Sequence, residues 1–220
     1  MSRLLFREIE RLKRLILGLG AAVEESLHRA VTAVQTRDAA LAEGVIEGDA
    51  EIDQMEIDVE EESLKILALH QPVAIDLRFI VAVLKINSDL ERIGDLAANM
   101  AERAVALSQM APAAVPVDLT GMTTHVKAMV KNVLDALVNL DAGLAREVCA
   151  ADDVVDNAHR EMYERAREQI QAEPETADRV LSLLSVSRGL ERIADHTTNV
   201  AQDVIYMLEG EIVRHRGATP

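Results

Sequence analysis

A charged motif that occurs twice constrains the possible folds of this chain more than any other feature. Leu-Glu-Arg-Ile-Gly-Asp occupies residues 90–95, and Leu-Glu-Arg-Ile-Ala-Asp occupies residues 190–195. An asparagine follows each copy four residues later, at Asn99 and at Asn199. An offset of 100 residues in a chain of 220 indicates two similar domains rather than an array of short units. The repeated positions include charged residues, although packing alone would tend to preserve only the apolar ones.

The composition favours packed helices over sheets. Aromatic residues make up 2% of the chain and Trp is absent, while 49% of the residues are hydrophobic. Ala, Leu, Glu and Arg keep their rotamers in a helix, whereas strands are enriched in aromatic and β-branched residues. No segment alternates with period two over a useful length. We therefore predict an all-α protein with a real hydrophobic core.

The charge balance limits the partners of the protein. With 23 basic and 38 acidic residues, the formal net charge is −15. A field of this sign repels phosphate backbones and anionic lipids, so we expect no nucleic-acid partner, but it attracts cations and basic protein surfaces. The single Cys149 excludes an intramolecular disulfide, and the apolar run 15–23 is too short to span a bilayer. These features predict a soluble cytoplasmic protein without a signal peptide.

Prolines divide the chain into amphipathic segments, because helices usually end at or before a proline. The apolar positions of the first segment recur every three or four residues, as on one face of a helix. We expect six long helices, at about 3–36, 39–70, 75–110, 119–140, 142–172 and 175–214. Residues 111–118 contain two prolines and are the predicted linker between domains 1–110 and 119–220. The predicted fold is two tandem, pseudo-symmetric three-helix bundles.

Counting from the proline turns predicts that acidic side chains meet across a helical hairpin. Asp53 lies 19 residues before Pro72 and Glu91 lies 19 after it, while Asp49 and Asp95 lie 23 before and after. In an antiparallel hairpin, equal counts place residues at equal heights. Residues spaced i,i+4 also share one helix face. The first half therefore predicts a cluster of four carboxylates.

The second half repeats this arrangement around Pro174. Asp156 and Glu191 lie 18 and 17 residues from it, and Asp152 and Asp195 lie 22 and 21 from it. Four carboxylates between packed helices repel one another unless a cation lies among them. Hard oxygen ligands suit Mg²⁺, Ca²⁺, Mn²⁺ or iron, Zn²⁺ is not excluded, and bridging carboxylates can hold several ions. Further candidate ligands are Asn99, Asn199 and His159, which has Glu56 as its counterpart in the first half.

Other interpretations of the acidic residues stay open. Acids spaced i,i+4 commonly form a solvated helix face, and the chain would then be a metal-free helical adaptor. A carboxylate-bridged metalloenzyme is a second alternative, but di-iron bundles need two Glu-x-x-His motifs and only Glu25 to His28 matches. We expect Arg92 and Arg192 to form ion pairs or partner contacts, because they project about 100° away from the adjacent glutamates. No residue pattern predicts catalysis or an ATPase.

The two motifs resemble those of the PhoU family of phosphate-signalling regulators. Residues 91–95 and 191–195 match its paired acidic motifs, residues 76–78 match its Asp-Leu-Arg element, and Gly48 with Asp49 and Asp53 matches the partner motif. The resemblance covers nearly the whole chain, in order. The second half departs from it, because Asp178-Arg179 follows Pro174 and Gly189 replaces the acid found at Asp89.

This resemblance implies a function that the residues alone do not reveal. Members of the family are cytoplasmic and all-helical, and some bind iron or other multinuclear metal clusters on these motifs. They act with the phosphate ABC importer and a membrane sensor histidine kinase, and they repress the phosphate-starvation response. The expected partners are therefore the ATP-binding subunit of the importer and the kinase, reached at the membrane through protein contacts. We expect no enzymatic activity, and the long exposed helices suggest a homodimer.

Overall fold

The predicted helices are present in the computed structural model, which describes residues 3–110 and 119–210. No strand occurs within these two ranges. A short 3₁₀ helix, η1, precedes the last α-helix. The elements in chain order are α1 (Arg3–Thr36), α2 (Ala39–His70), α3 (Ala74–Ser108), α4 (Thr120–Asn139), α5 (Ala142–Ala172), η1 (Pro174–Thr176) and α6 (Ala177–Glu209).

Local sequence signals set the helix ends. Asp38 caps α2 by accepting a hydrogen bond from the Leu41 amide at 3.0 Å, and Asp141 caps α5 from the Leu144 amide at the same distance. Two predicted ends of the last helix were wrong. Pro174 starts η1, so α6 begins at Ala177 rather than Glu175, and Gly210 ends α6 at Glu209 rather than Arg214 by adopting a φ of 76°. The predicted linker, 111–118, lies outside the described residues.

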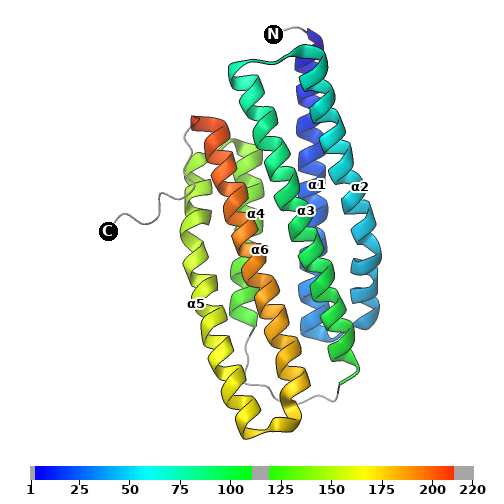
Figure 1. Cartoon of the computed structure of the whole chain (residues 1–220), viewed down its shortest axis with the longest axis vertical. Helices are drawn as coiled ribbons and strands as arrows, with labels where there is room; N and C mark the ends of the chain where they lie inside the picture. The colour runs from blue at the N-terminus through cyan, green and yellow to red at the C-terminus, as the bar shows by residue number, and fades with distance from the viewer. Residues whose placement is uncertain (1–2, 111–118, 211–220) are drawn as a thin grey trace, which may run out of the picture.

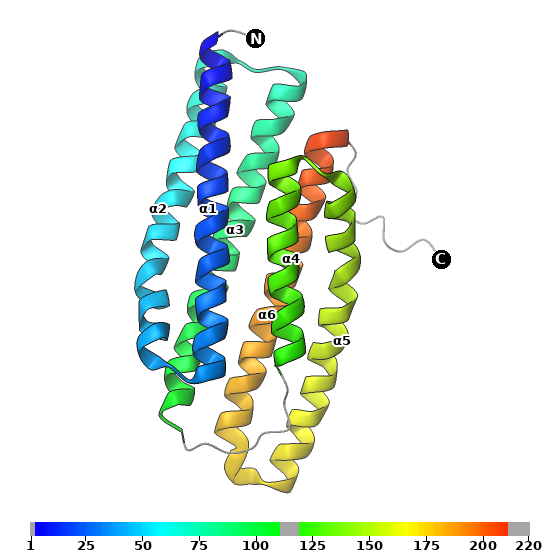
Figure 2. The ribbon, with the colours of Figure 1, turned by 180° about the vertical axis from the view of Figure 1, so that it is seen from behind.

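The six helices form two three-helix bundles that share one core. Helices α1–α3 form one bundle and α4–α6 form the other, with α3 beside α6 on one side of the molecule and α1 beside α4 on the other (Figures 1 and 2). The contact between α3 and α6 is the most extensive between any two helices. Apolar side chains from both halves join one continuous cluster. The two repeats are therefore fused along α3 and α6 rather than linked only by the chain.

The apolar residues of the repeated motif fix its orientation. Leu90 and Ile93 in α3, and Leu190 and Ile193 in α6, have no exposed surface. Burying a Leu or Ile side chain contributes roughly 1.5–3 kcal/mol, which holds each helix in one rotation about its axis. Because these residues face the core, the Glu and Asp of each motif lie on the adjoining face, toward the preceding helix of the same bundle.

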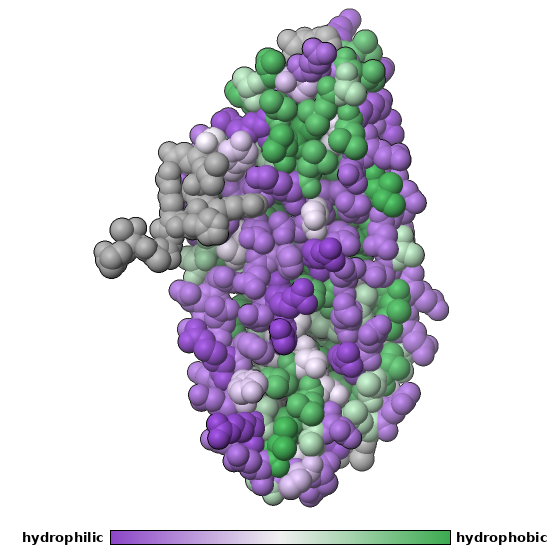
Figure 3. All heavy atoms as spheres, in the orientation of Figure 1, coloured by the Kyte–Doolittle hydropathy of each residue, from purple (hydrophilic) through white to green (hydrophobic). Residues whose placement is uncertain are grey.

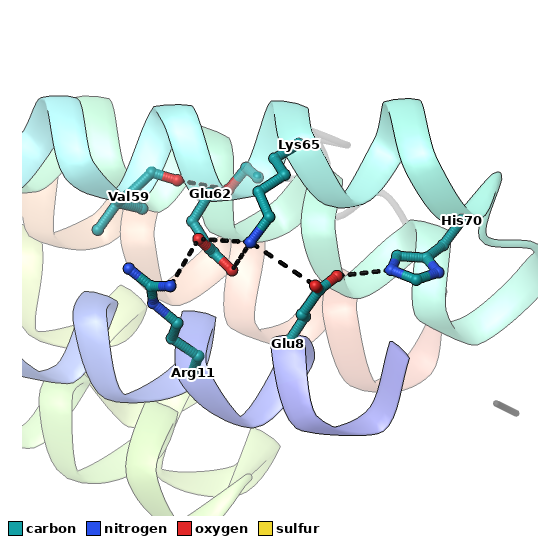
Figure 4. A network of polar contacts seen from close by, with 7 residues as sticks. Glu8, Arg11, Val59, Glu62, Lys65 and His70 are labelled. Carbon is teal, nitrogen blue, oxygen red and sulfur yellow. Dashed lines mark hydrogen bonds and ion pairs between the residues drawn. The ribbon is translucent and has the colours of Figure 1, made fainter. Parts of the chain in front are cut away.

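A polar network ties α1 to α2 at the end of the first bundle (Figure 4). Glu62 is only 5% exposed and pairs with Lys65 at 3.2 Å and Arg11 at 3.5 Å. Lys65 also lies 3.6 Å from Glu8, whose other oxygen contacts His70 Nε2 at 2.6 Å. Burial raises the pKa of Glu8, but the hydrogen bond from His70 and the charge of Lys65 lower it below its usual value. This network secures the helix ends that flank the α2–α3 turn.

Apolar side chains are exposed at the turn between α2 and α3. Leu69, Val73 and Ile75 are 66–74% exposed. Figure 3 shows hydrophobic surface at the upper end of the molecule, where the α2–α3 turn lies in Figure 1, and a more hydrophilic middle of the same face. None of the described helices has the length and hydropathy that crossing a bilayer requires.

Candidate metal centre

The α2–α3 hairpin brings three of the predicted carboxylates together. One oxygen each of Asp49, Asp53 and Asp95 can be chosen so that all three lie within 4.8 Å of one another. The hairpin turns at residues 71–73, so these acids occupy matching heights on antiparallel helices. Asp49 and Asp95 are half-buried, whereas Asp53 is exposed. The cluster therefore opens to solvent on one side, where an ion can enter.

Glu91 and Glu56 extend this first cluster. Burial raises the pKa of Glu91, and the negative charges of Asp95, Asp53 and Glu56 raise it further. Burial and the charges of Glu60 and Asp53 likewise raise the pKa of Glu56. The first half thus gathers five mutually repelling carboxylates, one more than the four expected there.

One oxygen of the first cluster has no partner. Asp49 Oδ1 is buried and accepts no hydrogen bond from the described residues. Burial, followed by the charges of Asp53 and Asp95, raises the pKa of this carboxyl. Burying a carboxylate oxygen without a donor costs free energy that a bound cation would offset. The donor set therefore fits a hard metal ion.

Arg92 partly neutralises the first cluster. Its Nη1 lies 3.1 Å from Asp95 Oδ2 and its Nε lies 3.5 Å from Glu91 Oε2. The sequence analysis placed Arg92 on a different face from Glu91, but its long side chain curves back along its own helix. Because it is 56% exposed, these pairs contribute only about 0–1 kcal/mol and leave the guanidinium free to move aside.

The second cluster contains a half-buried carboxyl, Asp152. Burial, then the charges of Asp195 and Asp156, raise the pKa of Asp152 to about 6, and the nearby Thr198 hydroxyl opposes this rise. The Asp152 Oδ1 is buried, but the Thr198 contact is too poorly aligned to count as a hydrogen bond by geometry. Burial raises the pKa of Glu191, as do the charges of Asp195 and Asp156, and burial and Asp156 raise that of Asp195. All four predicted acids of this half thus act on one another, although no three of them approach within the 4.8 Å found in the first cluster.

Each cluster is flanked by a polar contact that the sequence analysis missed. Asn87 donates to Glu56 Oε1 at 2.9 Å, and at the equivalent place Ser187 Oγ lies 2.7 Å from His159 Nδ1. Asn87 and Ser187 are 100 residues apart and precede Glu91 and Glu191 by four residues. The repeated stripe therefore begins one turn earlier than the motif. The signal in the sequence was a polar residue four positions before the glutamate in both copies of the motif.

The two asparagines point in different directions. Asn99 is exposed and donates to the backbone oxygen of Asp95 at 2.7 Å. Asn199 Nδ2 lies 3.3 Å from Asp89 Oδ1 on α3, and His196 Nδ1 lies 2.8 Å from the same oxygen. Asn199 and His196 thus contribute to the contact between the bundles.

Two weaker candidates lie elsewhere. His28 Nδ1 contacts Lys127 Nζ at 2.6 Å, between α1 and α4. The Cys149 thiol has a raised pKa because of burial and then the charge of Asp152, which disfavours the reactive thiolate. Neither residue belongs to a carboxylate cluster.

The whole chain is similar to proteins of known family. The sequence pattern of the PhoU domain matches residues 16–104 and again 119–204. A protein of Aquifex aeolicus named as a phosphate-specific transport system accessory protein PhoU homolog is 39% identical over 96% of each chain. A homologue of the same name from Pseudomonas putida is 38% identical over 96% of this chain and 82% of that protein.

Solved structures support the same assignment. The crystal structure of PhoU from Pseudomonas aeruginosa superposes with a TM-score of 0.89 at 37% identity, covering 93% of this chain and 99% of that one. The fold with two three-helix bundles, the two matches to one domain pattern and the similarity along the chain agree. The chain belongs to the PhoU family.

Proposed function

We propose that the protein is a negative regulator of phosphate uptake and phosphate signalling. It couples the ATP-binding subunit of a phosphate ABC importer to a membrane sensor histidine kinase, in the cytoplasm and through protein contacts. The observation that supports this most directly is similarity over 96% of the chain to proteins named as phosphate-specific transport system accessory proteins. A regulator of this kind acts by binding one conformation of its partner more tightly than another.

Metal binding at both carboxylate clusters is part of the proposal. The ligands are Asp49, Asp53, Glu91 and Asp95 in the first half and Asp152, Asp156, Glu191 and Asp195 in the second. A bound divalent or trivalent ion, iron or a multinuclear cluster included, would supply the positive charge that these acids lack. The buried Asp49 oxygen, which has no hydrogen-bond partner among the described residues, favours this over a metal-free adaptor. In this proposal the metal holds α2 to α3 and α5 to α6 and catalyses no reaction.

Two surface features suit contacts with the proposed partner proteins. The acidic charge suits basic protein surfaces, and the exposed apolar residues at the α2–α3 turn lie beside Asp76, Leu77 and Arg78. A homodimer through the long helices belongs to the same proposal.

Reconstitution with the two membrane partners tests the regulatory role. The importer's ATPase activity and the kinase's autophosphorylation are measured in proteoliposomes at high and low phosphate, with and without the chain. We expect both activities to fall when the chain is added at high phosphate and to recover at low phosphate. Unchanged activities at every phosphate level contradict the regulatory role. Repeating the assay with Asp53→Asn combined with Asp156→Asn separates metal binding from regulation.

A further inference from the structure

A polar pocket lies between α3 and α6, and none of its lining residues is one of the carboxylates proposed as ligands in the two clusters. A surface pocket of about 220 Å³ opens between these helices. Its lining comes from the two helices that run side by side where the bundles meet in Figure 1. The residues that line it follow one face of each helix and are Leu96, Asn99, Met100 and Arg103 from α3, and Ser185, Arg188, Gly189 and Arg192 from α6.

The charge of this pocket is opposite to that of the protein. Its lining contains three arginines and no acidic residue, whereas the chain has a net charge of −15. Arg103, Arg188 and Arg192 are exposed, and in the described part of the chain none of them forms an ion pair at direct contact distance. Arg188 and Arg192 act at longer range, since Arg188 opposes the rise in the pKa of Glu191 that burial causes, and Arg192 opposes the corresponding rise for Asp195. Three cations thus line one small pocket.

The internal repeat provides a reference for this pocket. An offset of 100 residues maps its lining onto the other side of the α3–α6 contact, where the equivalent residues are Lys85, Ser88, Asp89, Arg92, His196, Asn199, Val200 and Asp203. On that side, acidic and basic side chains of the protein pair with one another. Asp89 accepts contacts from His196 at 2.8 Å and Asn199 at 3.3 Å, and Lys85 lies 3.5 Å from buried Asp203.

Three replacements make the pocket cationic. Arg103 stands where the other side has Asp203, Gly189 where it has Asp89, and Arg188 where it has Ser88. The acids of the reference side are therefore absent here. A Cβ atom at Gly189 would lie 3.3 Å from Met100 Cγ, so even a small side chain would crowd the floor of the pocket. One side of the α3–α6 contact is thus filled by side chains whose charges cancel. The equivalent place on the other side is an open pocket with three positive charges.

We propose that this pocket binds a small phosphate-bearing anion. Guanidinium groups present paired N–H donors that match phosphate oxygens, and arginine is preferred wherever such oxyanions are recognised. Three positive charges favour a multiply charged anion over chloride. Asn99 Nδ2 uses one proton for the Asp95 backbone oxygen, which leaves its second proton for the ligand. The site requires neither a bound metal nor the proposed regulation, although Arg188 and Arg192 lie near Glu191 and Asp195 of the second cluster.

Calorimetric titration of the metal-free full-length chain tests the proposal. Orthophosphate and pyrophosphate are the probes, at constant ionic strength so that general screening does not change. Metal is removed with a chelating resin, because soluble polycarboxylate chelators are themselves anions. We expect one saturable site per chain for at least one probe, and the tighter of the two identifies the size of the ligand.

Substitutions then assign the site. Arg188→Gln, Arg192→Gln and Arg103→Gln should each weaken binding about tenfold or more, as expected for loss of one charged hydrogen-bond donor. Gly189→Asp should abolish binding, because it restores the acid of the reference side. Arg165→Gln is the matched control, since Arg165 is an exposed arginine on α5 that pairs with Glu161. Circular dichroism and thermal unfolding verify that each variant is folded.

Three results would overturn the proposal. The first is an absence of saturable binding by both probes. The second is binding that folded Arg188→Gln and Gly189→Asp variants retain at full affinity. The third is binding that appears only after metal is restored, which would place the anion on the carboxylate clusters instead.

Discussion

The carboxylate clusters of the two halves share a scaffold but differ in their donors and in their charge. The first contains five carboxylates, including Glu56, and Arg92 pairs with two of them. The second has His159 in place of Glu56, and its imidazole contacts Ser187 and lies near Glu191. An all-oxygen set favours hard ions, whereas one nitrogen donor also suits zinc and iron. The repeat thus preserves the position of the cluster while changing its donor atoms, and under the proposed metal binding the two halves should prefer different ions.

The side chains that pack between the two helices of each hairpin differ in size between the halves, and a smaller residue on one helix faces a larger one on the other. A Cβ atom on Gly94 would lie 3.0 Å from Ile52 Cγ2, so glycine lets α3 approach α2 there. In the second half the corresponding residues are Val155 and Ala194, both fully buried. One methylene is lost on the earlier helix and one methyl is gained on the later helix. The two hairpins therefore fill equivalent positions with two different side-chain pairs.

The largest effect that distinguishes the clusters should come from removing one of them. Asp49→Asn with Asp95→Asn should eliminate metal from the first half only, and Asp152→Asn with Asp195→Asn from the second only. Metal at a hundredfold excess over Kd stabilises a site by about 2.7 kcal/mol, or about 5–10 °C in a chain of this size. Elemental analysis and thermal unfolding with and without metal measure both quantities.

Asp58→Asn is the control for these double variants, because Asp58 is exposed and bonds to Gln54 outside both clusters. Full metal content in either double variant would show that the corresponding cluster is not a metal site.

The second effect, in the absence of metal, is a loss of stability as pH rises. The pKa of Asp152 is raised from 3.8 to about 6 by burial and then by Asp195 and Asp156. The folded state therefore holds this proton more tightly than the unfolded state. That stability is fully present below about 4 and is lost as pH rises through about 6. Urea unfolding of the metal-free chain between about pH 5 and 7.5 should show the decline.

Asp152→Asn tests the assignment, because it should flatten part of this pH dependence. Glu8 acts in the opposite direction, since its lowered pKa removes stability only as pH falls below 4.5, outside the measured window. A variant that retains the full decline between pH 5 and 7.5 would exclude Asp152 as its source.

A smaller effect should follow from exchanging the residues that distinguish the clusters. Glu56→His gives the first cluster an imidazole, and His159→Glu gives the second an all-oxygen set. We expect the preference for Zn²⁺ over Mn²⁺ to move with the imidazole by about tenfold, which is about 1.4 kcal/mol. Competition titrations on single-cluster backgrounds measure it. A preference that stays with the half of the chain rather than with the imidazole would contradict this assignment.

The smallest expected effect is a change in the free energy of unfolding when the Gly94–Ile52 contact is altered. Gly94→Ala should cost about 1 kcal/mol, because the added methyl meets Ile52. Replacing Ile52 by alanine removes both Cγ2 and Cδ1, so in that background the same change should stabilise the protein by up to about 1 kcal/mol, since alanine favours the helix over glycine. A double-mutant cycle by urea unfolding measures the coupling. Additive effects would show that the two residues do not compensate each other.

Local chemistry made much of the fold predictable. Apolar spacing, prolines and the Asp38 cap act within one or two helical turns, so most helix ends agree with expectation. Pairing of acids across each hairpin was also predictable, because counting from Pro72 requires only that the helices run antiparallel. The exceptions at Pro174 and Gly210 arose where a turn residue changed the backbone within a few positions.

Only the tertiary structure decided how the two repeats meet and what surrounds each acid. The sequence could not show that α3 packs on α6, because that contact joins residues about 100 positions apart with no turn to set their register. It also did not reveal that Arg92 curves back onto Asp95 or that Asn87 bonds to Glu56. Periodicity specifies which face of a helix is buried. Neighbouring helices decide which polar groups on the remaining faces find partners and which, such as the three pocket arginines, do not.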